Sequence, residues 1–163
     1  MSSLYTNIDG LTQAYGNVRA TGREGYTKKL STFGARNQLI IDFDFSTLSV
    51  FDEGDPQSST MDAFSELMAY IPEGAGIIAA SILPIDDFDE DLVVGTYEKD
   101  GTVVDADGLL EATTPTVAGG VEVGGGAQIA DVAGDDLYLV IANAVGGSPN
   151  TEGRGRLVVE YVK

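Results

Sequence analysis

The chain is predicted to fold as an all-β sandwich, jelly-roll-like, with an extended N-terminal arm. Three observations predict this fold. Apolar and polar residues alternate in several stretches, which is the period of a strand with one buried face. Clusters of Gly, Asp and Pro separate these stretches at short intervals, as they do in sandwiches and barrels. The first 36 residues show little periodicity and are rich in Gly, Thr, Ser, Asn and Tyr, which is typical of an extended segment.

The length of 163 residues suits one domain with a terminal extension. We therefore divide the chain into an extended basic arm, residues 1–36, and an acidic β-sandwich domain, residues 37–163. Charge supports this division: residues 1–40 hold five basic and two acidic residues, a net charge of +3, and the remainder holds four basic and 24 acidic residues, a net charge of −20. Such an arm is able to lie on its own body, on a neighbouring copy or on another acidic surface.

The clearest strand covers residues 38–46. Its buried side is predicted from four alternate apolar residues, Leu39, Ile41, Phe43 and Phe45. Ile40 is the exception, because it falls on the polar side. Further strands are expected at 77–83, 92–97, 102–104, 116–123, 128–132, 137–142 and 157–162. Residues 61–71 fit either a helix face or an irregular strand, and we expect a strand because their neighbours have β character.

Turns are expected where Gly, Asp and Pro gather. The clearest are residues 52–60, 99–101 and 105–108. Residues 124–126 are three consecutive glycines and are interpreted as a flexible break, because no Gly-Lys-Ser/Thr phosphate motif accompanies them.

The composition excludes several kinds of chemistry. Cysteine, histidine and tryptophan are all absent. A disulfide, a thiolate nucleophile and a Cys/His zinc site are therefore impossible within the chain, and the commonest general base near neutral pH is missing. We expect a protein that is not an enzyme, with no catalytic residues and no cofactor.

Calcium is a metal whose oxygen ligands the sequence supplies in quantity. The acidic stretch 86–91 and the Asp105-x-Asp107-Gly108 motif both offer carboxylates. The second motif departs from a calcium loop, since Leu109 and Thr116 stand where oxygen ligands are needed. We interpret both segments as solvated turns and predict no metal site, with a weak calcium module as a minor alternative.

The charge and the hydropathy pattern limit the partners. A net charge of −17 argues against direct nucleic-acid binding, which needs Lys and Arg. Residues 1–5 lack the features of a signal peptide, and the longest apolar stretch, 76–84, is too short for a membrane-spanning helix. We expect a soluble protein that is made in the cytoplasm and has no membrane partner.

The candidate interface residues all lie in the arm. Its tyrosines are spaced along it as anchors, each pairing a large apolar ring with a polar tip. Its basic residues offer ionic contacts to a neighbouring subunit or to a larger shell. The set is Tyr5, Tyr15, Arg19, Arg23, Tyr26, Lys28, Lys29 and Arg36.

Five short motifs occur in a characteristic order along the chain. They are Tyr15-Gly-Asn-Val-Arg19, the apolar stretch 64–70 leading into Ile71-Pro-Glu-Gly-Ala75, Val94-Gly-Thr-Tyr97, Asp100-Gly-Thr-Val-Val-Asp-Ala-Asp-Gly-Leu109 and Arg156-Leu-Val-Val-Glu-Tyr-Val162. This order, mainly over residues 60–163, resembles that of small virion proteins of tailed bacteriophages. Its motifs are turn-and-strand patterns and carry no catalytic residues.

The resemblance implies a decoration or cement protein of the capsid, with a β-sandwich or jelly-roll fold that often forms trimers. The expected partners are the major capsid protein and further copies of the chain, with a trimer favoured. The expected location is the capsid surface of the virion, after synthesis in the host cytoplasm. The alternative is a carbohydrate- or receptor-binding module of a virion fibre or adhesin, for which Tyr97 and Tyr138 are the aromatic candidates.

Overall fold

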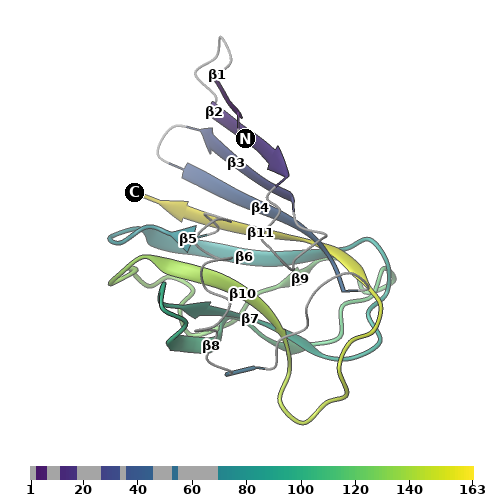
Figure 1. Ribbon diagram of the computed structural model, residues 1–163. Helices are drawn as coiled ribbons and strands as arrows, with labels where there is room; N and C mark the ends of the chain where they lie inside the picture. The colour runs from purple at the N-terminus through teal and green to yellow at the C-terminus, as the bar shows by residue number, and fades with distance from the viewer. Residues whose placement is uncertain (1–2, 7–11, 18–26, 34–35, 46–52, 55–69) are drawn as a thin grey trace.

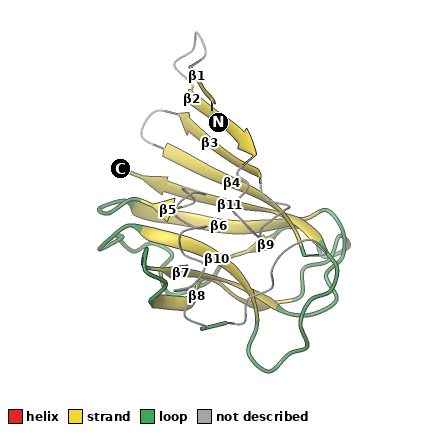
Figure 2. Cartoon of the chain, in the orientation of Figure 1, coloured by secondary structure: helices red, strands yellow, loops and turns green. Residues whose placement is uncertain are grey.

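The computed structural model describes residues 3–6, 12–17, 27–33, 36–45, 53–54 and 70–163. In these residues the regular elements are eleven strands, arranged in two antiparallel sheets (Figures 1 and 2). The all-β prediction is therefore confirmed for the described part of the chain.

The larger sheet has seven strands. In spatial order they are β1 (Ser3–Thr6), β2 (Thr12–Asn17), β3 (Thr27–Phe33), β4 (Arg36–Asp44), β11 (Arg154–Val162), β6 (Gly76–Pro84) and β9 (Glu122–Val123). Its centre is the pairing of β4 and β6 with β11, the last strand of the chain. The middle of the sheet thus joins segments that are far apart in the sequence.

The smaller sheet has four strands. In spatial order they are β5 (Tyr70–Ile71), β10 (Leu137–Asn143), β7 (Leu92–Tyr97) and β8 (Val103–Thr113). Both central strands, β7 and β10, are buried at every position, as their continuous apolar sequences predict.

One apolar core is shared by the two sheets. The larger sheet contributes alternate residues of β4 and β11, including Leu39, Leu157 and Val159, each at most 1% exposed. The smaller sheet contributes the whole of β7 and β10. Burial of these side chains is the main favourable term in folding, since each contributes roughly 1.5–3 kcal/mol.

Several predicted strands are confirmed. The structure places β4, β6, β7, β10 and β11 over the segments where alternation or continuous apolar runs predicted them. Residues 55–69 lie outside the described part of the chain, so the question of helix or strand is answered only for Tyr70–Ile71, which is β5.

Three sequence predictions are wrong. Residues 105–108 are not a turn but lie inside β8, where irregular pairing with β7 accommodates the Asp-Gly sequence. Of residues 116–123, only Glu122 and Val123 form a strand. Residues 128–132 form turns, with a single bridge from Val132 to Gly76. In the last two of these segments the large apolar residues are mostly exposed, at 54% for Val117, 53% for Val121 and 62% for Val132, so they lack the buried face of a sandwich strand.

Close packing, and not only flexibility, explains the three consecutive glycines. A Cβ atom at Gly124 would lie 2.1 Å from the Leu109 carbonyl oxygen, and one at Gly126 would lie 2.3 Å from the backbone of Gly108. A Cβ at Gly125 would meet no atom within 4 Å. The segment therefore runs against the backbone of β8 at two positions that exclude any side chain.

The N-terminal segment differs from the expected unpacked arm wherever it is described. Strands β1, β2 and β3 pair in an antiparallel succession, and β3 pairs with β4. They continue the larger sheet beyond β4, on the side away from β6 (Figure 1). The described parts of residues 1–36 thus form paired strands at one edge of the sheet.

Candidate interaction surface

One face of the larger sheet is turned away from the apolar core, and we call it the outer face. It is defined by the residues that alternate with the core residues: Gln38, Ile40 and Asp42 on β4, Arg156, Val158 and Glu160 on β11, and Ser81 and Leu83 on β6. These side chains are half-buried, apart from Leu83, which is exposed. The face exists because strand residues alternate between the two sides of a sheet.

Polar side chains on the outer face are joined across the strands. Arg156 donates two hydrogen bonds to Asp42, at 2.5 Å from Nε to Oδ1 and 3.1 Å from Nη2 to Oδ2. Gln38 Nε2 donates to Glu160 Oε1 at 2.9 Å. The bond to Asp42 raises the pKa of Arg156. A two-point contact between planar groups holds both side chains in one geometry and gives the face a fixed pattern.

An apolar pair lies between these two polar pairs. Ile40 is directly opposite Val158, which explains why an isoleucine interrupts the polar side of the predicted strand. The same register row crosses the whole sheet: Ser3, Tyr15, Lys29, Ile40, Val158, Ser81 and Val123. The outer face is thus a mixed surface, on which one apolar pair lies between two polar pairs.

Charge is distributed unevenly between the sheet and the rest of the chain. The seven strands of the larger sheet hold five basic and four acidic residues, a net charge of +1, in a chain whose net charge is −17. The remaining residues therefore carry −18. This sheet is the part of the molecule where another acidic surface meets least repulsion.

Carboxylates of the acidic stretch 86–91 bind the protein's own chain. Asp89 accepts hydrogen bonds from the Thr151 hydroxyl at 2.6 Å and from the Thr151 amide at 3.0 Å, and these bonds lower the pKa of Asp89. Arg154 Nε donates to Asp86 at 2.5 Å and lowers the pKa of that carboxyl. The stretch is therefore not simply a solvated turn, because its carboxylates bond the loop to neighbouring segments.

A buried aromatic ring fixes the middle of the same stretch. Phe88 is 4% exposed, and its ring centroid lies 5.7 Å from those of Phe43 and Phe45. Among the described residues no group of three or more acidic side chains is arranged to hold a metal ion. The arrangement gives this loop a structural role.

The second calcium candidate is also a structural element. Asp105 and Asp107 lie two residues apart in β8, where they hydrogen-bond to each other. Burial raises the pKa of Asp105, and the contact with Asp107 raises it further. A carboxyl that holds its proton more tightly is a poorer cation ligand.

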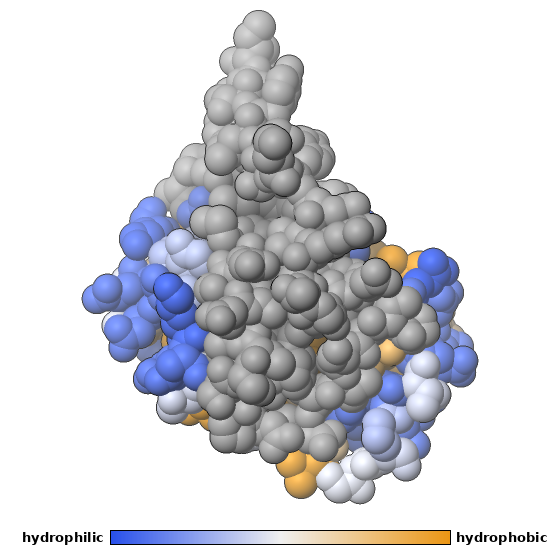
Figure 3. Space-filling view, in the orientation of Figure 1, coloured by the Kyte–Doolittle hydropathy of each residue, from blue (hydrophilic) through white to orange (hydrophobic). Residues whose placement is uncertain are grey.

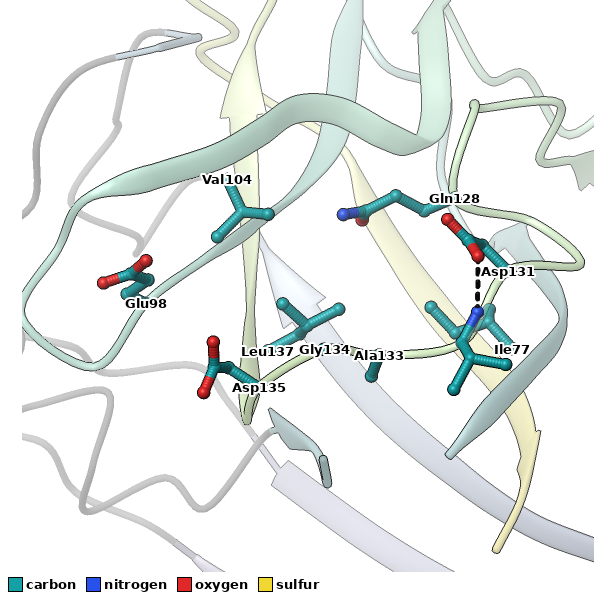
Figure 4. Close-up of a pocket in the computed structure, with 10 residues that line it drawn as sticks. Ile77, Glu98, Val104, Gln128, Asp131, Ala133, Gly134, Asp135 and Leu137 are labelled. Carbon is teal, nitrogen blue, oxygen red and sulfur yellow. Dashed lines mark hydrogen bonds between the residues drawn. The ribbon is translucent and has the colours of Figure 1, made fainter. Parts of the chain in front are cut away.

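A groove lies at one end of the molecule and has a volume of about 240 Å³. Its apolar lining includes Ile77, Val104 and Leu137. Three carboxylates also line it. In Figure 4, those of Glu98 and Asp135 lie on one side of Val104 and Leu137, and that of Asp131 lies on the other.

The predicted interface residues are only partly located. Tyr5, Tyr15, Lys28 and Lys29 belong to strands β1, β2 and β3, and the register pairs Tyr15 with Lys29. Arg36 begins β4 and lies 4.0 Å from Glu160. Arg19, Arg23 and Tyr26 lie outside the described residues. Their role at an interface stays a prediction.

Sequence reasoning missed the cross-strand contacts of Asp42, Arg156 and Glu160. A signal was present, because Asp42 and Asp44 on one strand and Arg154 and Arg156 on another have opposite charges at the same spacing of two. Spacing alone does not say which strands are neighbours, so the pairing became visible only in the structure.

The aromatic candidates for sugar binding are not available at the surface. Tyr97 is 0% and Tyr138 is 6% exposed. Tyr138 also stacks on Tyr70, with 5.4 Å between the ring centroids. Both rings belong to the apolar core.

On the side seen in Figure 3 the described part of the surface is largely hydrophilic, with separate hydrophobic spots. In the described part of the chain no helix is long and apolar enough to cross a membrane.

The fold defines a class of all-β proteins in which two antiparallel sheets share a core. Comparison of the chain with protein-family models, curated proteins and solved structures finds no match in any of the three.

Proposed function

We propose that this chain is a structural virion protein that decorates or cements the icosahedral capsid of a tailed phage, by binding between major capsid protein subunits. In this proposal it acts without a cofactor and without catalysis. Its task is to bridge neighbouring capsomers from the outside, and the many identical sites of a shell multiply the effect of each weak contact.

The observation that carries the proposal is the partition of charge. A protein that is acidic everywhere would repel both its own copies and an acidic shell. The larger sheet has a net charge of +1 while the rest of the chain carries −18. The proposal assigns the outer face to docking and the acidic loops to solvent, where they keep free copies apart.

The fixed pattern of the outer face also supports docking. Asp42 and Arg156 hold each other in place, and the Ile40–Val158 pair lies beside them. A preordered surface loses little side-chain entropy on binding. The same proposal includes a jelly-roll topology and a trimer. It also includes contacts of residues 1–36, as an arm, with the shell or with a neighbouring subunit.

The test is co-sedimentation with mature capsids of the virus that carries this chain. Saturable binding of the purified protein is expected. The substitutions are Leu83→Glu on the outer face and Val123→Glu, which is paired with the outer-face residue Ser81; the two positions are 43% and 72% exposed. Both should weaken binding about tenfold or more by placing unpaired charge in the contact.

Val145→Glu is the matched control, because Val145 is 75% exposed but lies outside the sheet. It should bind like the unmodified protein. If the unmodified protein does not co-sediment with capsids, the cement proposal is wrong. A glycan array then tests the alternative role as a carbohydrate- or receptor-binding module.

A further inference from the structure

The groove at one end of the molecule carries negative charge, and we call it the acidic groove. Its lining includes the carboxylates of Glu98, Asp131 and Asp135 and no lysine or arginine. Within the described part of the chain, the ion pairs join arginines to other carboxylates, those of Asp42, Asp86 and Glu160. The acidic groove therefore favours a cationic group that comes from another molecule.

Basic residues lie beside a valine at one corner of the larger sheet, which we call the basic corner. Arg36 begins β4 and is directly opposite Val162, the last residue of β11, and Lys163 follows Val162. The side chain of Arg36 is 70% exposed, and its distance of 4.0 Å from Glu160 is longer than a hydrogen bond. Lys163 is exposed as well. The basic corner thus offers two cationic groups beside a half-buried apolar side chain.

The strand register places the basic corner and the acidic groove at the same end of the molecule. Val162 pairs with Gly76 of β6, and Gly76 forms a bridge to Val132, which lines the groove. In Figure 1 the C-terminus and the start of β6 lie on the same side. Two strand spacings, roughly 10 Å, separate Val162 from Val132. Strand β6 lies between them, so the corner and the groove of one chain do not meet.

Apolar surface accompanies the charges of the groove. Val104 and Val132 are 43% and 62% exposed, and a contact that covers them removes apolar area from water while it pairs the charges. The groove volume of about 240 Å³ is below the roughly 300–1,000 Å³ of small-molecule pockets. The space therefore suits a few side chains of a protein surface.

A second copy of the chain is the partner that the charges favour. Each copy carries both surfaces at one end, so copies are able to meet with a corner of one at the groove of the next. The net charge of −17 makes copies repel one another except where opposite charges face each other. We propose that the basic corner of one copy docks in the acidic groove of another, with its two cationic groups facing Glu98 and Asp135.

The contact joins two different surfaces, so it closes as a dimer or as a ring according to the rotation between copies. It gives a structural basis for the oligomer but does not depend on binding to a capsid. A failure of self-association and a failure of capsid binding are therefore separate results, obtained in separate experiments.

Sedimentation velocity over a range of protein concentrations tests the contact by charge reversal. Glu98→Lys with Asp135→Lys reverses the groove, and Arg36→Glu with Lys163→Glu reverses the corner. Each pair should weaken self-association about tenfold or more. The chain with all four substitutions keeps the net charge of −17 and should associate like the unmodified protein, because both sides of the contact are reversed together.

Glu111→Lys with Glu152→Lys is the matched control for the groove reversal. Both variants change the net charge from −17 to −13, but the control does so at exposed positions outside the groove. It should leave self-association at or above its original strength. Thermal unfolding of each variant verifies the fold.

Cross-linking locates the contact without changing a charge, because the chain contains no cysteine. Gly134 lines the groove, and a side chain there meets no atom within 4 Å. A short bismaleimide should join Gly134→Cys chains to Val162→Cys chains severalfold more than it joins Val145→Cys chains to Val162→Cys chains. Val145 is exposed and lies near the opposite end of β10 from the groove residue Leu137.

The proposal is overturned by an unmodified protein that stays monomeric at every concentration, or by a groove reversal without effect. Failure of the folded fourfold variant to restore association also overturns it. If a charge-reversed variant does not fold, the cross-linking decides, and equal yields in the two mixtures contradict the contact.

Discussion

At the scale of single residues, carboxylates in this protein act mainly as hydrogen-bond acceptors for its own loops. Asp89 binds Thr151, and Asp91 accepts a hydrogen bond from the Thr114 hydroxyl. Asp100 accepts from the Thr102 amide at 2.9 Å and has a lowered pKa because of that bond. The many Asp residues of this sequence therefore stabilise turns by hydrogen bonds as well as making the surface polar.

Replacing Asp89 by Asn should make the stability of the protein less dependent on acid. The hydrogen bonds from Thr151 hold the pKa of Asp89 below its ordinary value of 3.8. Its stabilisation is therefore fully present above that ordinary value and is lost as the pH falls through the lowered one. Because the carboxyl is exposed, we expect Asp89→Asn to cost only about 1 kcal/mol at pH 6 and close to nothing at pH 2.

Urea unfolding of both proteins at the two pH values measures this difference. Glu111→Gln is the control, because Glu111 is an exposed carboxylate on β8. It should shift stability by less than about 0.5 kcal/mol. An equal cost of Asp89→Asn at both pH values would show that the charge on Asp89 is unimportant.

Asn143 is a buried polar residue with a structural task. It is 1% exposed, and its Oδ1 accepts hydrogen bonds from the Asn150 amide at 2.9 Å and from Asn150 Nδ2 at 3.2 Å. Asn143→Ala should cost about 2 kcal/mol, because it removes the acceptor for a buried donor. Urea unfolding checks this. Val145→Ala, two residues further along the chain and 75% exposed, should change stability very little, and a similar loss in both variants would argue against the hydrogen bonds.

At the scale of elements, the sequence identifies strands well where one face or both faces are buried. Apolar and polar residues alternate in β4, and β7 and β10 are mainly apolar throughout. The hydrophobic pattern was therefore sufficient to predict these three strands. For β8 the prediction ended the strand at residue 104, because Asp105 to Gly108 has turn composition, whereas β8 continues to Thr113. Pairing with β7 overrides this local turn preference, and such pairing cannot be read from the local composition.

The glycine segment supports an element-scale prediction with an internal control. A Cβ at Gly124 would lie 2.1 Å from a carbonyl oxygen of β8, whereas Gly125 has open space. Gly124→Ala should destabilise the fold by about 2 kcal/mol or more, since backbone atoms must move. Gly125→Ala should be neutral or stabilise by up to about 1 kcal/mol, through a less flexible unfolded chain.

Chemical unfolding of the two alanine variants side by side provides the measurement. Gly126→Ala should lose stability as Gly124→Ala does, because a Cβ atom at Gly126 would lie 2.3 Å from the backbone of Gly108. If Gly124→Ala and Gly126→Ala lost no more stability than Gly125→Ala, the close approach of this segment to β8 would not contribute to stability.

At the scale of the whole molecule, the sequence indicated the fold class and the uneven charge but not the sheet that carries it. The contrast between residues 1–40 and the rest was visible in the composition. The joining of β4 to β11, which pairs Asp42 with Arg156, requires contact between residues 114 positions apart. Long-range pairing of this kind has no local signal, so the outer face could not be assembled from the sequence.

The net charge of −17 leads to a prediction about salt. Like charges on the acidic loops repel one another, and the screening length falls from about 30 Å at 0.01 M salt to about 8 Å at 0.15 M. Screening should relieve this repulsion more than it weakens the Asp42–Arg156 and Asp86–Arg154 pairs. The Tm should therefore rise by about 2–5 °C over this range, measured by thermal unfolding at low protein concentration.

A variant with fewer charges separates this repulsion from other effects of salt. Glu98→Gln, Glu111→Gln, Asp135→Asn and Glu152→Gln together change the net charge from −17 to −13, counted over the full sequence. These positions are exposed, so the fold should persist with a higher Tm at low salt and a smaller response to added salt. A Tm that falls as salt is added would mean that the ion pairs of Arg154 and Arg156 stabilise the fold more than the repulsion between acidic loops destabilises it.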